Sequence, residues 1–373
     1  MSLGARLEGK RVCICAGSGG VGKTTTSAAL AMGLAARGRK VAVVTIDPAR
    51  RLANSLGLAE LGNEPRQIES ERFESLGVEM HGELWAMMLD PKRTFDDLVA
   101  GLAPDEESRR EVLANRIYQQ LSSAVAGSQE FSAVVKLYEL ERSGEFDMLV
   151  LDTPPSRNAL DFLEAPTRLT NFLEGRALRM FLAPTGLASR VVGRGTGVVF
   201  SLVRRLTGVD LLQDLSVFFR VLGGVLDGFR QRAVAVDALL HERSTAFLIV
   251  TSPEAEPVEE AIYFRSQLRR TRMPFAALVV NRVHPAELLE VDPEDARREL
   301  ASRVGDALAR RAAANLTDFQ VLAERDRESV ARLVAELDHP DPVLVPHLDV
   351  DVHDTYGLVQ VAHHLFAASA PAA

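Results

Sequence analysis

Eight residues near the start of the chain restrict its fold more than any other segment. They match the pattern G-x-x-x-x-G-K-[ST] and lie between an apolar segment, residues 12–16, and an alanine-rich segment, residues 24–37. The order of apolar strand, glycine-rich loop and helix predicts a phosphate-binding loop. The loop consists of Gly17, Ser18, Gly19, Gly20, Val21, Gly22, Lys23 and Thr24.

Each fixed position of this pattern has a chemical purpose. Glycines let backbone N–H groups curl around phosphate oxygens, and the N-terminus of the following helix adds a favourable dipole. Lys23 has the length to reach the β- and γ-phosphates, and the Thr24 hydroxyl is a suitable ligand for Mg²⁺. The segment therefore predicts binding of ATP or ADP with Mg²⁺.

The same glycines also allow a different interpretation. Gly17, Gly19 and Gly22 fit G-x-G-x-x-G, and Asp47 after the next apolar segment could then bind a ribose, as in an NAD(P)-dependent oxidoreductase. That interpretation gives Lys23 no role. It also leaves unexplained the apolar segment 146–151, which ends in Asp152 as a metal-binding Walker B strand does.

Apolar segments recur along the chain and predict the fold class. Segments 12–16 and 41–46 flank the first helix and form a βαβ unit. Later apolar segments follow the same alternation with helical stretches, which predicts a doubly wound, mostly parallel α/β sheet of the P-loop NTPase type. These segments are residues 84–89, 148–151, 246–250, 276–280 and 343–345.

Two long stretches depart from this alternation. Residues 95–140 and 158–240 have helical patterns and predict a helical subdomain added to a single domain that spans residues 1–373. The second stretch is locally basic and rich in large apolar residues between Arg168 and Arg232. It predicts a groove for a hydrophobic protein client, a patch for an acidic membrane surface, or a helical layer packed on its own sheet or a partner subunit.

Composition excludes some classes of function and location. The formal net charge is −8 at pH 7, which argues against a general nucleic-acid-binding protein. The only cysteines, Cys13 and Cys15, lie in one apolar segment and are expected to pack in the core. The polar residues 1–10 lack the apolar core of a signal peptide, so we expect a reduced, cytoplasmic protein.

Several motifs together resemble the arsenite-pump ATPase (ArsA) family, which also holds the ATPases that target tail-anchored membrane proteins. The likeness covers nearly the whole chain. It lies in the segments Gly19–Thr25, Thr45–Arg50, Trp85–Lys92, Ala126–Phe131, Leu151–Pro155 and Val279–Val283.

The resemblance implies roles for individual residues. Thr25 joins the nucleotide-binding loop, Asp47 orients or activates the attacking water as the catalytic residue, and Asp152 contacts Mg²⁺ through water. Residues 153–158 form a mobile loop that responds to the γ-phosphate. Asn281 recognises adenine and Pro346 lines the adenine pocket. Members of this family act as dimers that close around ATP, so a homodimer, or a heterodimer with a related ATPase, is implied.

The chain also departs from the family pattern. Many members carry a signature lysine at the position of Ser18, which reaches the partner's phosphates; a serine has no charge to replace it. Arg50 and Arg157 are candidates for the missing cation. No cysteines outside residues 12–16 are available for a C-x-x-C zinc site or for arsenite, so neither zinc nor arsenite regulation is expected.

These observations favour an ATPase that couples ATP turnover to rearrangement of a dimer and acts on a protein client or partner. Hydrolysis is expected to be slow or dependent on a partner because of Ser18. A nucleotide-binding regulatory or scaffold protein with negligible hydrolysis is the main alternative, and an NAD(P)-dependent oxidoreductase is a further one.

Overall fold

The computed structural model describes residues 2–47, 49–103, 105–115, 118–119, 128–153, 228, 230–339, 341–348, 352 and 354–367. The chain divides into two compact units. The first comprises Met1–Leu89, Leu140–Ala159 and His241–Ala373, and the second comprises Asp90–Glu139 and Leu160–Leu240.

The first unit is built on one eight-stranded sheet in the order β3-β4-β2-β5-β1-β6-β7-β8. All neighbouring strands are parallel except the short edge pair β3–β4, which is antiparallel. The strands are β1 (Val12–Ala16), β2 (Lys40–Thr45), β3 (Arg66–Gln67), β4 (Glu83–Met88), β5 (Met148–Asp152), β6 (Thr245–Thr251), β7 (Phe275–Val283) and β8 (Val343–Pro346).

Helices connect these strands and cover the sheet, as expected for strands that are apolar throughout. The first unit contains α1 (Leu3–Arg6), α2 (Lys23–Ala36), α3 (Arg51–Ser55), α4 (Glu71–Glu74), α14 (Ala255–Thr271), the 3₁₀ helix η1 (Ala286–Glu290), α15 (Pro293–Val304), α16 (Asp306–Leu337) and α17 (Thr355–Phe366). The predicted doubly wound α/β fold is confirmed.

The core lies on both faces of the sheet. On one face, Cys13, Cys15 and neighbouring strand residues pack against α2 and α17. Both thiols are free and fully buried. On the other face, Phe247 of β6 packs edge-on against Phe264 of α14, with ring centroids 6.5 Å apart. The central strand β1 is buried at every residue, so the loop that follows it starts from a rigid support.

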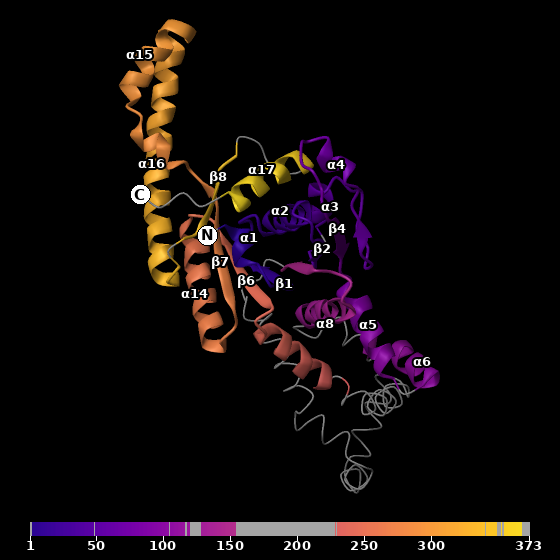
Figure 1. Cartoon of the computed structure of the whole chain (residues 1–373). Coiled ribbons are helices and arrows are strands. Elements are labelled where there is room, and N and C mark those ends of the chain that lie inside the picture. The colour runs from indigo at the N-terminus through magenta and orange to yellow at the C-terminus, as the bar shows by residue number, and fades with distance from the viewer. Residues whose placement is uncertain are drawn as a thin grey trace, which may run out of the picture. The chain divides into compact units, whose positions relative to one another are not determined.

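Helices α2 and α17 pack closely on one another (Figure 1). Gly33 makes this approach possible, because a Cβ atom there would lie 2.1 Å from the ring of Phe366. The guanidinium of Arg37 lies over the same ring, 4.0 Å from its centroid. The helix that begins at the phosphate loop is therefore held in place by the last helix of the unit.

The connection from β7 to β8 contains a long helical hairpin. Helix α16 has 32 residues, about 48 Å of helix, and packs against α15 after a turn at Gly305. Sequence analysis gave no indication of an element of this length. Near β7, the fully buried carboxylate of Asp326 on α16 accepts hydrogen bonds from the backbone and the ring of His284, which ties the hairpin to the end of β7.

The described part of the second unit is helical. It contains α5 (Pro91–Leu102), α6 (Glu106–Ala114), the first part of α8 (Ser128–Ser143) and a helical stretch at residues 230–240. Tyr118 stacks on Phe95 and donates a hydrogen bond of 2.6 Å to Asp96. Most of the predicted helical stretch 158–240, including its basic and apolar part, lies outside the described residues. In the part of the chain that the structure describes, no helix is long and apolar enough to cross a membrane.

Candidate functional site

The loop between β1 and α2 has the backbone that a phosphate-binding loop requires. Gly20 and Gly22 have φ angles of 79° and 89°, in the left-handed region that glycine adopts without strain. Gly17 lies against β6, where a Cβ atom would be 1.9 Å from the carbonyl oxygen of Val250. The glycines predicted from the motif are thus required by backbone conformation at two positions and by close packing at a third.

Lys23 lies over this loop as the first residue of α2. Its side chain is 5% exposed, and its Nζ donates a hydrogen bond of 2.5 Å to the backbone oxygen of Ser18. Burial lowers the pKa of Lys23, and the nearby carboxylate of Asp152 opposes that shift. A buried ammonium group with one hydrogen bond to the loop has donors left for an anionic ligand.

Asp152 ends β5 directly beside the loop. The parallel register places it opposite both Cys15 of β1 and Thr45 of β2. Its Oδ2 accepts hydrogen bonds from Thr24 and Thr45, at 2.8 and 2.9 Å. Burial raises the pKa of Asp152 to about 6, while those two hydrogen bonds and Lys23 act in the opposite direction.

The second oxygen of this carboxylate, Oδ1, is buried and has no hydrogen-bond partner. An orphaned carboxylate oxygen is costly in the protein interior unless another group satisfies it. A threonine hydroxyl and a carboxylate are also the oxygen donors that Mg²⁺ prefers. Thr24 and Asp152 therefore fit the magnesium site expected from the motif.

Asp47 follows β2 on the same edge of the sheet. Its Oδ1 accepts a hydrogen bond of 2.9 Å from the backbone of Ala49, so the residue also shapes the turn. Its Oδ2 lies 3.8 Å from Arg51 on α3. This carboxylate therefore has one oxygen committed to the backbone and one that faces a cation.

Asn281 and Pro346 come from β7 and β8 on the other side of the loop. Asn281 donates a hydrogen bond of 2.9 Å from Nδ2 to the backbone oxygen of Val21. A Cβ atom on Gly22 would lie 2.3 Å from the same Nδ2. Pro346 is paired with Val283 at the end of β8. The structure thus brings Asn281 against the phosphate loop, while Pro346 lies one strand further away.

A cavity of about 370 Å³ opens over the loop. Six of the residues expected from the sequence line it: Gly20, Gly22, Lys23, Thr24, Thr25 and Asp47. Thr153, the first residue of the loop expected to respond to the γ-phosphate, also lines it. Five further residues line it that sequence analysis did not single out for the nucleotide, namely Arg51, Asn54, Ser55, Arg282 and Val352. The other predicted residues, Gly17, Ser18, Gly19, Val21, Asn281, Pro346 and the buried Asp152, support the loop or border it rather than line this cavity.

The cations around the cavity differ from those proposed from the sequence. Arg50 precedes α3 and is exposed, and it is not among the residues that line the cavity. Its neighbour Arg51 does line it, as does Arg282. Arg157 lies outside the described residues. Spacing carried a signal for Arg51, because it follows Asp47 by four positions and one helical turn can bring such a pair together.

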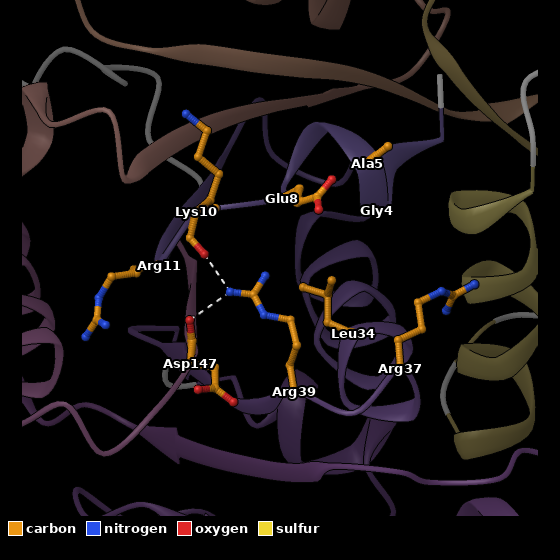
Figure 2. A pocket seen from close by; sticks show the side chains of 10 residues that line it. Gly4, Ala5, Glu8, Lys10, Arg11, Leu34, Arg37, Arg39 and Asp147 are labelled. Carbon is orange, nitrogen blue, oxygen red and sulfur yellow. Dashed lines mark hydrogen bonds between the residues drawn. The ribbon is translucent and has the colours of Figure 1, made fainter.

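A second cavity, of about 560 Å³, lies at the opposite edge of the sheet. Figure 2 shows that its basic side chains, Lys10, Arg11 and Arg37, point in different directions rather than to a common centre. Arg39 is held between the backbone oxygens of Lys10 and Asp147, at 2.6 and 2.8 Å. These side chains satisfy carbonyl groups at the ends of helices and strands, which is a structural role.

Within the described ranges, no group of three or more histidine, cysteine or acidic side chains is placed to hold a metal ion. The expectation that the chain binds no zinc therefore stays a prediction.

Comparison with known proteins decides the family. Residues 10–310 match the family described as anion-transporting ATPase, which is most of the chain. This chain belongs to the anion-transporting ATPase family. The resemblance inferred from the motifs is confirmed.

Individual relatives are distant but extend over much of the chain. The chain is 25% identical to ATPase GET3 of Podospora anserina over 293 residues, which is 78% of this chain and 79% of the relative. It is 27% identical to ATPase GET3 of Malassezia globosa over 272 residues, covering 72% and 71%. It is 28% identical to ATPase ARSA1 of Chlamydomonas reinhardtii over 335 residues, covering 82% of this chain and 38% of that protein.

Proposed function

We propose that this protein binds and hydrolyses Mg-ATP, and that the nucleotide drives rearrangement of a dimer that acts on a protein client or partner. One observation carries the catalytic part of the proposal. The buried Asp152 accepts from the Thr24 hydroxyl with Oδ2, keeps an unsatisfied Oδ1, and lies beside a loop whose lysine still has free donors. Membership in a family of ATPases supports the same activity.

Each residue has a distinct role in this proposal. The loop amides and Lys23 would bind and neutralise the phosphate oxygens, and Thr24 and Asp152 would hold Mg²⁺. When bound, the metal neutralises charge on the β- and γ-phosphates. Asp47 would orient the attacking water with Oδ2, the oxygen that the turn leaves free of backbone hydrogen bonds. Asn281 and Pro346 would border the adenine.

Arg51 would change partner during this cycle. Its guanidinium lies 3.8 Å from Asp47, and the Arg51 side chain is 60% exposed although Asp47 is only 13% exposed, so the ion pair is long and half solvated. A triphosphate in the cavity would compete with Asp47 for Arg51, because both line the same cavity. We propose that this competition releases the Asp47 carboxylate for water when ATP is bound.

The dimer, the client and the location rest on the likeness to relatives and on the cysteines. The relatives named GET3 and ARSA1 are described as ATPases, and the likeness to them supports a shared mechanism. We propose a homodimer or a heterodimer, a helical subdomain formed by residues 95–140 and 158–240, and no nucleic-acid partner. Free, fully buried thiols at Cys13 and Cys15 support a cytoplasmic location.

The experiment compares wild type with Asp47→Asn, measuring Mg-ATP binding by calorimetry and phosphate release in parallel. We expect both proteins to bind Mg-ATP and only wild type to hydrolyse it. Equal hydrolysis by the two proteins would remove Asp47 from the mechanism. Absence of Mg-ATP binding by wild type would refute the proposed function as a whole.

A protein that binds ATP with negligible hydrolysis is a second candidate. Ser18 favours it, because the position offers no charge for the transition state, and the hydrogen bond that links it to Lys23 uses its backbone oxygen. Binding without turnover in wild type, at protein concentrations high enough for dimers, would favour this candidate.

A further inference from the structure

Arg282 lies at an irregularity in the sheet beside the candidate site. Asn281 pairs with Val345 and Val283 pairs with Pro346, so the register of β7 and β8 shifts between them. Arg282 has a φ angle of 62°, in the left-handed region. That conformation is uncommon for a residue with a side chain, and such outliers cluster at functional sites.

The irregularity changes where the side chains point. In a regular strand, Asn281 and Arg282 would face opposite sides of the sheet. A bulge inserts a residue and redirects side chains, often beside an active site. Here Asn281 contacts the phosphate loop at Val21, and Arg282 lines the cavity over the same loop together with Lys23 and Thr24.

Arg282 also differs from the other cations of the cavity in its partners. Lys23 donates to the backbone oxygen of Ser18, and Arg51 faces Asp47. Among the residues that the structure describes, none forms an ion pair or a hydrogen bond with the Arg282 side chain, which is exposed. Within the described part of the chain, the donors of Arg282 are thus all available to a ligand.

We infer that Arg282 binds the phosphate chain of the nucleotide and supplies, from this chain, positive charge that Ser18 does not carry. A guanidinium presents paired donors that match two phosphate oxygens and stays charged at any physiological pH. The inference rests on the proposed function, because it requires a nucleotide in this cavity.

The alternative is that Arg282 is a solvated surface arginine. Its left-handed backbone conformation allows an experiment to distinguish this alternative from phosphate binding. Glycine adopts a left-handed φ without strain, so Arg282→Gly should leave the fold as stable as wild type or more stable. An arginine that only meets solvent could be replaced by glycine with no loss. If Arg282 binds phosphate, the Arg282→Gly variant should keep or gain stability but bind the nucleotide more weakly.

A matched control exists in the same unit. Arg272 follows α14 with a φ angle of 60°, and it is not among the residues that line the cavity. Arg272→Gly repeats the chemical change and the relief of backbone strain away from the loop. Arg282→Gln removes the charge while keeping most of the side-chain length, so it tests the charge without the backbone effect.

The experiment measures Mg-ATP affinity by calorimetry and the urea midpoint for wild type and the three variants. We expect Arg282→Gly and Arg282→Gln to bind Mg-ATP about tenfold more weakly, as for one lost charge-assisted hydrogen bond, with a weaker dependence on salt. Arg272→Gly should bind as wild type does, and neither glycine variant should unfold at lower urea than wild type.

Affinities of both Arg282 variants within twofold of wild type would overturn the inference and leave the proposed function intact. An equal loss in Arg272→Gly would also overturn it, because the effect would then be general. If wild type does not bind Mg-ATP, the proposed function itself is refuted. The wild-type measurement gives this result before any variant is compared.

Discussion

Two glycines of the phosphate loop allow backbone strain to be separated from side-chain packing. Gly20 and Gly22 both have left-handed φ angles, 79° and 89°. A Cβ atom on Gly20 would have no atom within 4 Å, whereas one on Gly22 would lie 2.3 Å from Nδ2 of Asn281. Gly20→Ala and Gly22→Ala therefore impose similar strain on the backbone but differ in the space available.

The structure gives the expected magnitudes. A side chain in the left-handed region costs about 1–2 kcal/mol, which is the whole effect expected for Gly20→Ala. In Gly22→Ala the amide of Asn281 must also move away and lose its hydrogen bond to Val21, a further loss of about 1 kcal/mol. The total for Gly22→Ala is about 2–3 kcal/mol.

Urea unfolding followed by tryptophan fluorescence measures this difference. The chain has a single tryptophan, Trp85 on β4, so the signal comes from the unit that contains the loop. With an m-value of about 1–3 kcal/mol per molar urea, the midpoint of Gly22→Ala should lie about 0.3–1 M below that of Gly20→Ala. The measurement is made without nucleotide, so that lost binding does not contribute.

A double-mutant comparison identifies the cause. In an Asn281→Ala background the clashing amide is gone, and both alanine substitutions should then cost the same within about 0.5 kcal/mol. Equal midpoints for the two single variants would refute the packing argument. A difference that persists unchanged without Asn281 would show that another contact is responsible.

Three further predictions concern charge and packing. Burial raises the pKa of Asp152 to about 6, above the ordinary value of about 3.9. The stability that this carboxyl contributes is thus fully present below pH of about 4 and lost as pH rises through about 6, so Asp152→Asn should raise the urea midpoint more at pH 8 than at pH 5. Asp326→Ala leaves the half-buried backbone N–H and ring of His284 without their acceptor, and should lower stability by about 2–3 kcal/mol, with faster proteolysis of α16 at low protease concentration. Gly33→Ala should lower stability by about 1–3 kcal/mol through its clash with the ring of Phe366, and Phe366→Leu in the same chain should recover part of that loss, as a thermal unfolding series would measure.

The sequence was sufficient to predict the parts of the fold that depend on local pattern. Apolar segments such as 12–16 and 148–151 coincide with β1 and β5 to within a residue, because strands buried on both faces are apolar throughout. The start of α2 at Lys23 follows from the glycine before it. The edge strand β3, two exposed residues long, has no such pattern and was not predicted.

The parts of the candidate site that depend on tertiary contacts could not be predicted from the sequence in the same way. The pairing of Asp152 with both Thr24 and Thr45 follows from the register of three strands that are far apart in sequence. No motif marks Arg282 in the sequence, because the register shift that redirects its side chain is a property of β7 and β8 together. Sequence motifs identify the loop, whereas the register of the strands determines which cationic side chains lie around it.

The packing of α17 on α2 has a consequence for the order in which the chain matures during synthesis. Helix α2 leaves the ribosome early, but the helix that covers its Gly33 face is made only after residues 355–366 have been translated. The strands that pair with β1, namely β5 and β6, are also translated later. Until then the apolar face of α2 is open to other proteins, a state in which chaperones bind growing chains. The earliest segment of the nucleotide site is therefore among the last to reach its native surroundings.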